Sequence, residues 1–409
     1  MLKSVLEEMK IESISVCNYR SINELKLDKL SPITVLVGRN NTGKSTLLEA
    51  FALGATARIG WFDALGDDLI KILVQRRGGW RFADLMLRMG AKCSEIEIKG
   101  DDVNGIVRIA SRVEDLPKAF SSTIISGIND YMERLIRRTS DELLARMDVS
   151  ARASRERILL IENEFRRARE RIVSQIRGFV TFEDYLNLKH TEYAVLLGEA
   201  FREELSSIFE RYPVYGIEDV DIIRSSRRTS SNVSFMLSPS SSYIQELQRR
   251  LARSGDLIKL IDLMRERIDY FEDIREVEDS FLVFLKGLSR PVPLEAMGDG
   301  FRVKLAILAA ISTANGGIAL VEEPEVRLHP GFMGSISKQI SETASLNEVQ
   351  YVISTHSTEF LDFLLRDSPD LIKVVRMYRS TEGEIDYEVL SGAEAIEESA
   401  KLKADLRGV

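Results

Sequence analysis

A run of eight residues at 38–45 has the composition of a phosphate-binding loop. It reads G-R-N-N-T-G-K-S and matches the pattern G-x-x-x-x-G-K-[ST]. In this pattern, backbone N–H groups of the loop and the N-terminus of the following helix surround a phosphate group. Lys44 can then reach the outer phosphates, and the Ser45 hydroxyl can bind Mg²⁺. The residues expected to contact a nucleotide here are Gly38, Arg39, Asn40, Asn41, Thr42, Gly43, Lys44, Ser45 and Thr46.

The two flanks of this loop also fit the pattern. Residues 33–37 are all apolar apart from one threonine and predict a buried strand, and residues 46–51 are helix-forming. The motif needs this strand–loop–helix context, which a chance glycine-rich turn would lack. Asn41 stands where glycine is common, but asparagine tolerates a left-handed backbone. We therefore expect the loop to keep its shape.

Two adjacent carboxylates follow a second apolar run. Residues 318–321 read I-A-L-V, and Glu322, Glu323 and Pro324 come directly after them. In a nucleotide hydrolase, the first carboxylate acts on the metal or its waters and the second polarises the attacking water. A pair of solvated surface glutamates is the alternative. The position directly after a buried strand, with a proline that ends the pairing, favours a site.

Two weaker signals lie on either side of this carboxylate pair. Gly298, Asp299 and Gly300 precede an apolar helix, so they would form an exposed N-terminal cap; a simple helix-capping turn explains them equally well. His356 follows the apolar strand at 351–353. A histidine is more often structural, but the C-terminal ends of parallel strands are where α/β sheets gather their ligands.

The elements that position these residues divide the chain into three parts, which we expect at 1–112, 113–230 and 231–409. The first and third parts alternate short apolar strands with helices, and the first ends in a predicted hairpin. The third part is expected to be helical from 243 to about 275. The middle part reads as strongly helical, with an apolar stripe at Ile158, Ile161, Phe165, Ala168 and Ile172.

Arginines gather in the middle part. They cluster at 134–138, at 152–177 and at 224–228, and include Arg166, Arg167 and Arg171. One interpretation is a solvated helix surface with intrahelical ion pairs. The other is a face that binds phosphates or nucleic acid.

The overall composition excludes several classes of protein. With 44% hydrophobic and 29% charged residues among 409, the chain is an ordinary globular one. It has no apolar run of about 18 residues and no signal peptide, so we expect no membrane span and a cytoplasmic location. Its two cysteines and three histidines suit reduced thiols rather than a zinc site. A net charge of −8 argues against coating nucleic acid by bulk charge.

The order of the motifs is more informative than any one of them. It runs from G-R-N-N-T-G-K-S through G-D-G-F and E-E-P-E-V-R-L-H-P to S-T-H-S. This order resembles the ABC-type ATPases of the SMC/RecF class and is most similar to the ATPase module of the OLD (overcoming lysogenization defect) family. Residues 11–22, I-E-S-I-S-V-C-N-Y-R-S-I, are typical of the same class. The resemblance implies an α/β fold: a P-loop ABC-type ATPase with a mixed sheet, an antiparallel β subdomain and a helical insertion.

The resemblance also implies a role for each motif, with ATP and Mg²⁺ as the bound cofactors. Residues 298–300 would replace the usual signature motif and reach the nucleotide of a second subunit in an ATP-bound homodimer, with residues 325–330 on the dimer seam. Gln75 is the best candidate for the glutamine that such ATPases direct at the metal. Lys44 and Thr46 would bind phosphates, and Ser45 and Glu322 would bind Mg²⁺. Glu323 would be the general base, and His356 would contact the γ-phosphate. The Walker B acid is usually aspartate, so Glu322 departs from the pattern by one methylene.

The expected function is therefore ATP hydrolysis by a dimer that acts with DNA or with a nuclease partner, in genome maintenance or anti-phage defence. OLD proteins continue into a Toprim nuclease domain, and this chain stops about where that domain would begin. The nuclease could lie on another polypeptide, the ATPase could stand alone, or the sequence could be part of a longer one. A slow ATP-gated sensor or scaffold is an alternative. The ATPase subunit of a membrane transporter is another, against which stands the missing L-S-G-G-Q.

Overall fold

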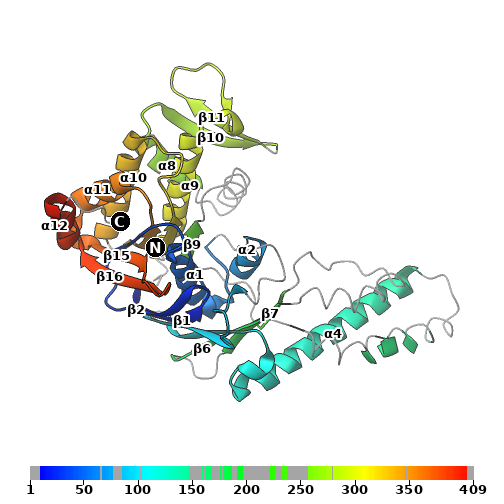
Figure 1. The fold of residues 1–409 in the computed structure, drawn as a ribbon. Helices are drawn as coiled ribbons and strands as arrows, with labels where there is room; N and C mark the ends of the chain where they lie inside the picture. Colours follow the sequence, from blue (N-terminus) through cyan, green and yellow to red (C-terminus); the bar gives the residue numbers. More distant parts are fainter. Residues whose placement is uncertain are drawn as a thin grey trace.

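Two large β-sheets with one helix packed between them form the centre of the molecule (Figure 1). The helix is α1 (Lys44–Ala55), and every residue of it except Ser45 is buried. Its alanines, leucines and phenylalanine contact both sheets, as expected of a helix that is apolar on all sides. The computed structural model describes residues 10–64, 67–76, 85–101, 103–146, 156, 159–160, 162–164, 166–167, 176, 178–186, 191–196, 222–225, 233–236, 257–278, 280–346 and 348–402.

The predicted motifs follow strands of the six-stranded sheet. Its strands are parallel except for the edge strand β16, which is antiparallel to β15. The central strands are buried on both faces, which explains their continuous apolar sequences. Their order is β16 (Ile385–Ser391), β15 (Ile372–Arg379), β3 (Ile33–Val37), β14 (Val349–Ser354), β13 (Gly317–Glu322) and β9 (Val233–Met236).

The second sheet is antiparallel and has seven strands. One face packs on α1, so its strands alternate between buried and exposed residues where the other face is solvated. The order is β2 (Ile22–Leu27), β1 (Ile11–Tyr19), β4 (Cys93–Gly100), β5 (Asn104–Ala110), β6 (Phe179–Asp184), β7 (Thr191–Leu196) and β8 (Ile222–Arg224). Strands β4 and β5 form the predicted hairpin.

A layer of helices forms a second core with the other face of the six-stranded sheet (Figure 1). These helices are α8 (Leu257–Arg267), α9 (Asp299–Thr313), α10 (Pro330–Ser345) and α11 (Thr358–Asp367), with α12 (Gly392–Leu402) beside β16. A small sheet of β10 (Phe271–Val277), β11 (Ser280–Leu285) and β12 (Val292–Pro293) lies next to α8. The 3-10 turns are η1 (Ala57–Ile59), η2 (Val113–Asp115), η3 (Leu294–Ala296) and η4 (Pro369–Leu371).

The structure confirms the α/β fold class but corrects two local predictions. The part at 113–230, expected to be helical, contains the long helix α4 (Lys118–Arg146) and also strands β6, β7 and β8. These strands are short and lie between helix-forming segments, so periodicity did not separate them. The helical prediction up to about 275 is also wrong, because β10 starts at Phe271. The predicted stripe at 158–172 lies outside the described residues.

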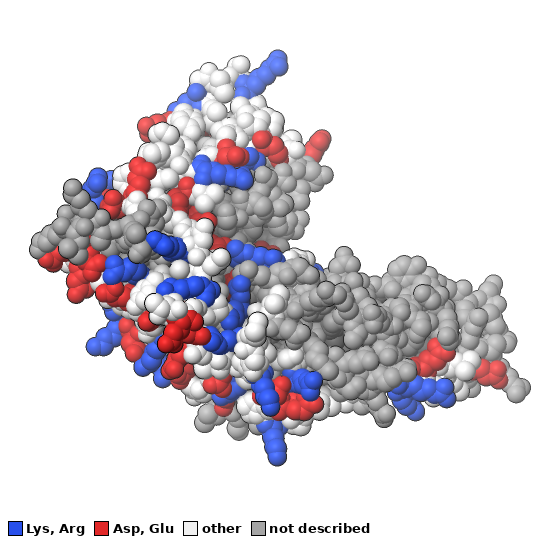
Figure 2. Space-filling model, viewed as in Figure 1, with Lys and Arg blue, Asp and Glu red and all other residues white. Residues whose placement is uncertain are grey.

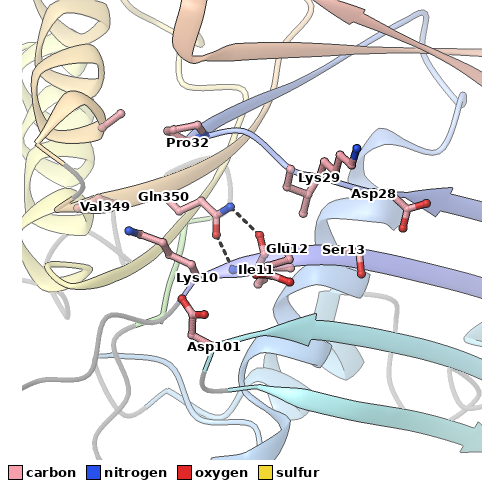
Figure 3. A pocket seen from close by; sticks show the side chains of 12 residues that line it. Lys10, Ile11, Glu12, Ser13, Asp28, Lys29, Pro32, Asp101, Val349 and Gln350 are labelled. Carbon is pink, nitrogen blue, oxygen red and sulfur yellow. Dashed lines mark hydrogen bonds between the residues drawn. The ribbon is translucent and has the colours of Figure 1, made fainter.

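The Gln350 side chain, at the start of β14, links the two sheets. The Gln350 amide oxygen accepts from the Ile11 N–H (2.8 Å), and its nitrogen donates to the Ile11 carbonyl (2.9 Å). Figure 3 shows this pair of bonds beside a cavity of about 650 Å³. Gln350 thus acts as one extra rung of a β-ladder, linking the start of β14 to the start of β1.

Candidate functional site

A cavity of about 680 Å³ brings distant motifs together at the carboxyl ends of the parallel strands. Most of its walls come from the phosphate-binding loop and the start of α1. Glu323 and His356 enter from the ends of β13 and β14. The lining residues are Arg20, Ser21, Asn40, Asn41, Thr42, Gly43, Lys44, Ser45, Thr46, Arg76, Glu323, His356 and Arg379.

The loop at 38–45 folds around the Lys44 ammonium. Lys44 Nζ donates to the carbonyl oxygens of Gly38 (2.9 Å) and Arg39 (2.8 Å), so the loop already encloses a cation. Burial lowers the pKa of Lys44 to about 8, although the nearby carboxylates of Glu323, Glu325 and Glu322 oppose this. Asn41 has φ 62°, the left-handed conformation that its sequence position requires.

Strands β15 and β16 pack against the phosphate-binding loop. A Cβ added to Gly38 would lie 2.2 Å from the Met377 carbonyl oxygen, and one added to Gly43 would lie 2.6 Å from Ile385 Cδ1. Arg379, at the end of β15, donates to the Asn41 carbonyl at 2.9 Å. Both glycines are therefore required by close approach as well as by their positive φ. The sequence motif alone carries no sign of this hairpin.

The two carboxylates after β13 point in different directions. Glu322 is the last residue of the strand and its side chain is 5% exposed. Glu323 has φ 47°, an uncommon conformation for glutamate, and its N–H donates to the Ser354 carbonyl at 2.8 Å. This turn directs the Glu323 carboxylate at His356, whose Nε2 lies 3.0 Å from Glu323 Oε1. The pair can hold a proton between carboxylate and imidazole.

Glu325 holds the histidine segment in place. Its Oε1 accepts from Thr355 Oγ1 (2.7 Å), from the His356 N–H (2.8 Å) and from the Ser357 N–H (3.2 Å). A carboxylate that accepts several N–H bonds is a strong anchor. From the sequence alone, residues 325–330 are expected on a dimer seam, and nothing indicates this role of Glu325 inside the subunit.

A chain of ion pairs extends from the cavity wall into the buried interior. Arg76, the last residue of α2 (Leu69–Arg76), lies 2.6 Å from Glu322 Oε2 and 3.4 Å from Glu49 Oε1. Arg20 pairs with the other oxygen of Glu49. Gln75 is exposed on α2 and is not among the cavity-lining residues, whereas its neighbour Arg76 is. The role of Gln75 at a metal stays a prediction.

The turn at Gly298, Asp299 and Gly300 lies outside this cavity, at the start of α9. Asp299 pairs with Arg302 and, at 3.8 Å, with Arg327, whose carbonyl oxygen is 3.4 Å from a Cβ added at Gly300. Among the described residues, none has an atom within 4 Å of a Cβ added at Gly298. The predicted signature turn and the segment at 325–330 therefore share one surface.

The donors at the cavity suit Mg²⁺. Ser45 lines the cavity, and Glu322 is not itself a lining residue but pairs with Arg76, which is. Both offer hard oxygen ligands, and Mg²⁺ is usually held by one or two protein ligands together with phosphate oxygens and water. The described residues contain no group of three His, Cys, Asp or Glu side chains that could hold a metal by themselves.

The described arginines of the middle part have mixed surroundings. Arg137 of α4 and Arg166 line one cavity together with Glu133 and Glu162. Figure 2 shows basic and acidic side chains interspersed on the described surface of one face. Arg171 lies outside the described residues. In the described part of the chain, no helix is both long enough and apolar enough to span a bilayer.

Comparison with known proteins finds two uncharacterized proteins of Methanocaldococcus jannaschii. One is 44% identical over 70 residues, which are 17% of this chain and 31% of that protein. The other is 31% identical over 117 residues, 27% of this chain and the whole of that protein. The chain thus spans about a third of the length of the first relative.

Solved structures with a similar fold include heads of SMC proteins. The Smc head domain with an extended coiled coil, bound to the C-terminal domain of ScpA, from Pyrococcus furiosus is 15% identical and covers 97% of this chain and 100% of that chain, with a TM-score of 0.43. The SMC head domain from Thermotoga maritima is 10% identical and covers 93% and 99%, with a TM-score of 0.40. Both similarities are too loose to carry an argument about the site.

The match to a family model is decisive. The model of the AAA_21 family, an AAA domain ascribed to AbiEii-type toxins of type IV TA systems, matches residues 33–362. This stretch includes the phosphate-binding loop, Glu322, Glu323 and His356. The chain therefore belongs to the AAA_21 family of AAA-type ATPase domains.

Proposed function

We propose that this domain hydrolyses ATP with Mg²⁺ in the cavity at the carboxyl ends of β3, β13 and β14. One observation carries the proposal: Lys44, Glu323 and His356, far apart in sequence, line the same cavity. Lys44 supplies positive charge for the phosphates, and Ser45 and Glu322 would hold Mg²⁺, which shields phosphate charge when bound.

The proposed chemistry at the γ-phosphate falls to Glu323 and His356. Glu323 takes the proton of the attacking water as a general base. His356 Nε2 lies 3.0 Å from that carboxylate, so its N–H orients Glu323, and it can donate to the phosphate only by leaving that carboxylate. The backbone of the turn at Glu323 is fixed by its bond to Ser354, which limits how far the base can move.

We further propose that two copies close head to tail on ATP. The support is the position of Gly298 and Gly300, which lie at an open helix N-terminus on the surface and not in the cavity of their own subunit. A helix N-terminus favours a phosphate placed against it. In such a dimer, this turn would complete the partner's site.

We also propose that the protein acts with DNA or with a nuclease partner, in genome maintenance or anti-phage defence, and that it is related to the OLD family. Arg134, Arg137 and Arg138 are exposed on α4, which extends away from the sheets (Figure 1). Glu133 and Glu162 line the same cavity as Arg137 and Arg166, and these negative charges weaken the support for a phosphate-binding face.

A slow, ATP-gated sensor is the second candidate, favoured by the Arg76–Glu322 ion pair. The acid proposed for Mg²⁺ is already bound to a cation, so the site has to rearrange before it can turn over. A turnover below about one per minute, against a typical enzyme median near 10 per second, would favour the sensor.

Steady-state phosphate release by wild type, Glu323→Gln and Lys44→Ala tests the proposal. Glu323→Gln should reduce turnover by about 10²–10⁴-fold, because the amide cannot accept the proton, and should retain ATP binding. Lys44→Ala should lose binding in a titration with a fluorescent ATP analogue. Glu382→Ala, exposed in the β15–β16 turn, is the matched control and should behave as wild type. Unchanged turnover in Glu323→Gln would remove that residue from the mechanism.

A further inference from the structure

The acid proposed to hold Mg²⁺ is bound to an arginine in this structure. Arg76 Nη2 lies 2.6 Å from Glu322 Oε2, within charge-assisted hydrogen-bond distance, and its Nη1 lies 3.4 Å from Glu49 Oε1. Arg20 binds the second oxygen of Glu49. The four side chains therefore alternate in charge, in the order Arg20, Glu49, Arg76, Glu322.

Burial makes a cation at Glu322 necessary. The side chain of Glu49 is 0% exposed and that of Glu322 is 5% exposed, whereas Arg76 is 30% exposed toward the cavity. An uncompensated buried carboxylate is strongly destabilising, so each of these acids needs a positive partner. Arg76 is the partner of Glu322 here.

Mg²⁺ and Arg76 compete for Glu322. Mg²⁺ needs the carboxylate oxygen, directly at about 2.0–2.1 Å or through a bound water, and Arg76 Nη2 already occupies one of the two oxygens. Two cations on one carboxylate also repel each other. Arg76 can leave Glu322 without losing every partner, because Glu49 remains within 3.4 Å.

We propose that Arg76 is a built-in cation that neutralises Glu322 in the nucleotide-free protein and is displaced to Glu49 when Mg²⁺ arrives with the nucleotide. This inference rests on the proposed function, since it takes Glu322 as the metal acid. Arg76 thereby lowers the affinity for the metal and keeps the buried acid stable before it binds. Arg76, and not Gln75, is then the residue of α2 that acts on the metal site.

The test is the ratio of nucleotide affinity with Mg²⁺ to that with EDTA, measured with a fluorescent, non-hydrolysable ATP analogue. In Arg76→Gln this ratio should rise by about tenfold, the factor that matches one charge-assisted hydrogen bond. Mn²⁺ affinity by electron paramagnetic resonance, at saturating analogue, should rise by a similar factor. Arg88→Gln is the control: Arg88 also pairs with a glutamate, Glu384, but is not among the residues that line the cavity, so its loss should leave the ratio unchanged.

A second pair of variants isolates the contact. In a Glu322→Gln background, Arg76→Gln should not change the ratio, because the competition is already absent. An unchanged or lower ratio in Arg76→Gln, or the same rise in the Glu322→Gln background, would overturn the inference. If Arg76→Gln does not fold alone, it should fold with Mg²⁺ and the analogue but not with the analogue in EDTA; failure of that rescue would also overturn it.

The two levels of the proposal fail differently. A wild-type protein that binds no nucleotide would overturn the proposed function and this inference together. A wild type that binds nucleotide with Mg²⁺, and an Arg76→Gln variant with an unchanged ratio, would overturn the inference alone.

Discussion

Replacing Glu325 by alanine should loosen the segment that holds His356 in the cavity. Glu325 Oε1 accepts from one hydroxyl and two backbone N–H groups, those of Thr355, His356 and Ser357, at 2.7–3.2 Å. Alanine removes the acceptor of all three. The Ser357 N–H keeps a second acceptor, because it also lies 3.0 Å from Thr355 Oγ1.

The expected loss follows from the number of bonds. A hydrogen bond to a charged group contributes roughly 1.5–3 kcal/mol, so three would give at most about 9 kcal/mol. Water can replace part of this at a half-buried site, and one N–H keeps its partner, so we expect a loss of about 3 kcal/mol in the free energy of unfolding. Glu325→Gln keeps an acceptor oxygen without the charge and should lose only about 1 kcal/mol.

Guanidinium chloride unfolding of these variants measures the difference, read from the midpoint at constant slope. Glu382→Ala, an exposed glutamate, should stay within about 0.5 kcal/mol of wild type. The reasoning is refuted if Glu325→Ala unfolds like Glu382→Ala, or if Glu325→Gln is as unstable as Glu325→Ala. The imidazole signals of His356 should broaden or shift in the alanine variant alone.

Four other predictions concern the cavity and its surroundings. Gly38→Ala should lose nucleotide binding, because the added Cβ would lie 2.2 Å from a carbonyl of β15; calorimetry showing wild-type affinity would contradict this. The pKa of Lys44 is lowered to about 8, so nucleotide affinity should fall as pH rises through 8, and binding near this pH should take up a proton. Calorimetry in buffers of different ionisation enthalpy measures this uptake, and an affinity that stays constant with pH would contradict the prediction. Gly300→Arg should block dimer closure and spare nucleotide binding by the monomer, which sedimentation with ATP tests; a normal ATP dimer would exclude this turn from the seam. If DNA is a ligand, Arg166→Glu with Arg167→Glu should weaken binding and lower its salt slope by about 0.9 per lost phosphate contact, and an unchanged slope would return both residues to a solvated helix surface.

Local features of the site could be predicted from sequence because each is contiguous. The phosphate-binding loop lies between a buried strand and a helix within about 20 residues, and the left-handed Asn41 follows from its position in that loop. Glu323 and His356 could be placed at strand ends because the apolar runs before them are short and continuous.

Pairings between distant segments could not be predicted. Arg76 and Glu322 are 246 residues apart, and nothing in either neighbourhood indicates the other. The close approach of β15 to Gly38 could not be predicted either, because the phosphate-binding motif by itself accounts for a glycine at this position. Strands β6 to β8 were missed because a strand of three to six residues has little periodicity of its own.

The Gln350–Ile11 bonds tie the two sheets together at the end that lies away from the cavity. Gln350 joins them where β14 and β1 begin, while the far ends of the same strands lead to His356 and Arg20 in the nucleotide cavity. At about 3.3 Å per residue, the path from Ile11 to Arg20 along β1 is about 30 Å, and the path from Gln350 to His356 along β14 is about 20 Å. A ligand that contacts both His356 and Arg20 therefore acts on both sheets at once, at the end opposite this link. Gln350→Ala removes the link without touching the cavity, while α1 still packs on both sheets and the Tyr387 hydroxyl of β16 still donates to the Lys26 carbonyl of β2.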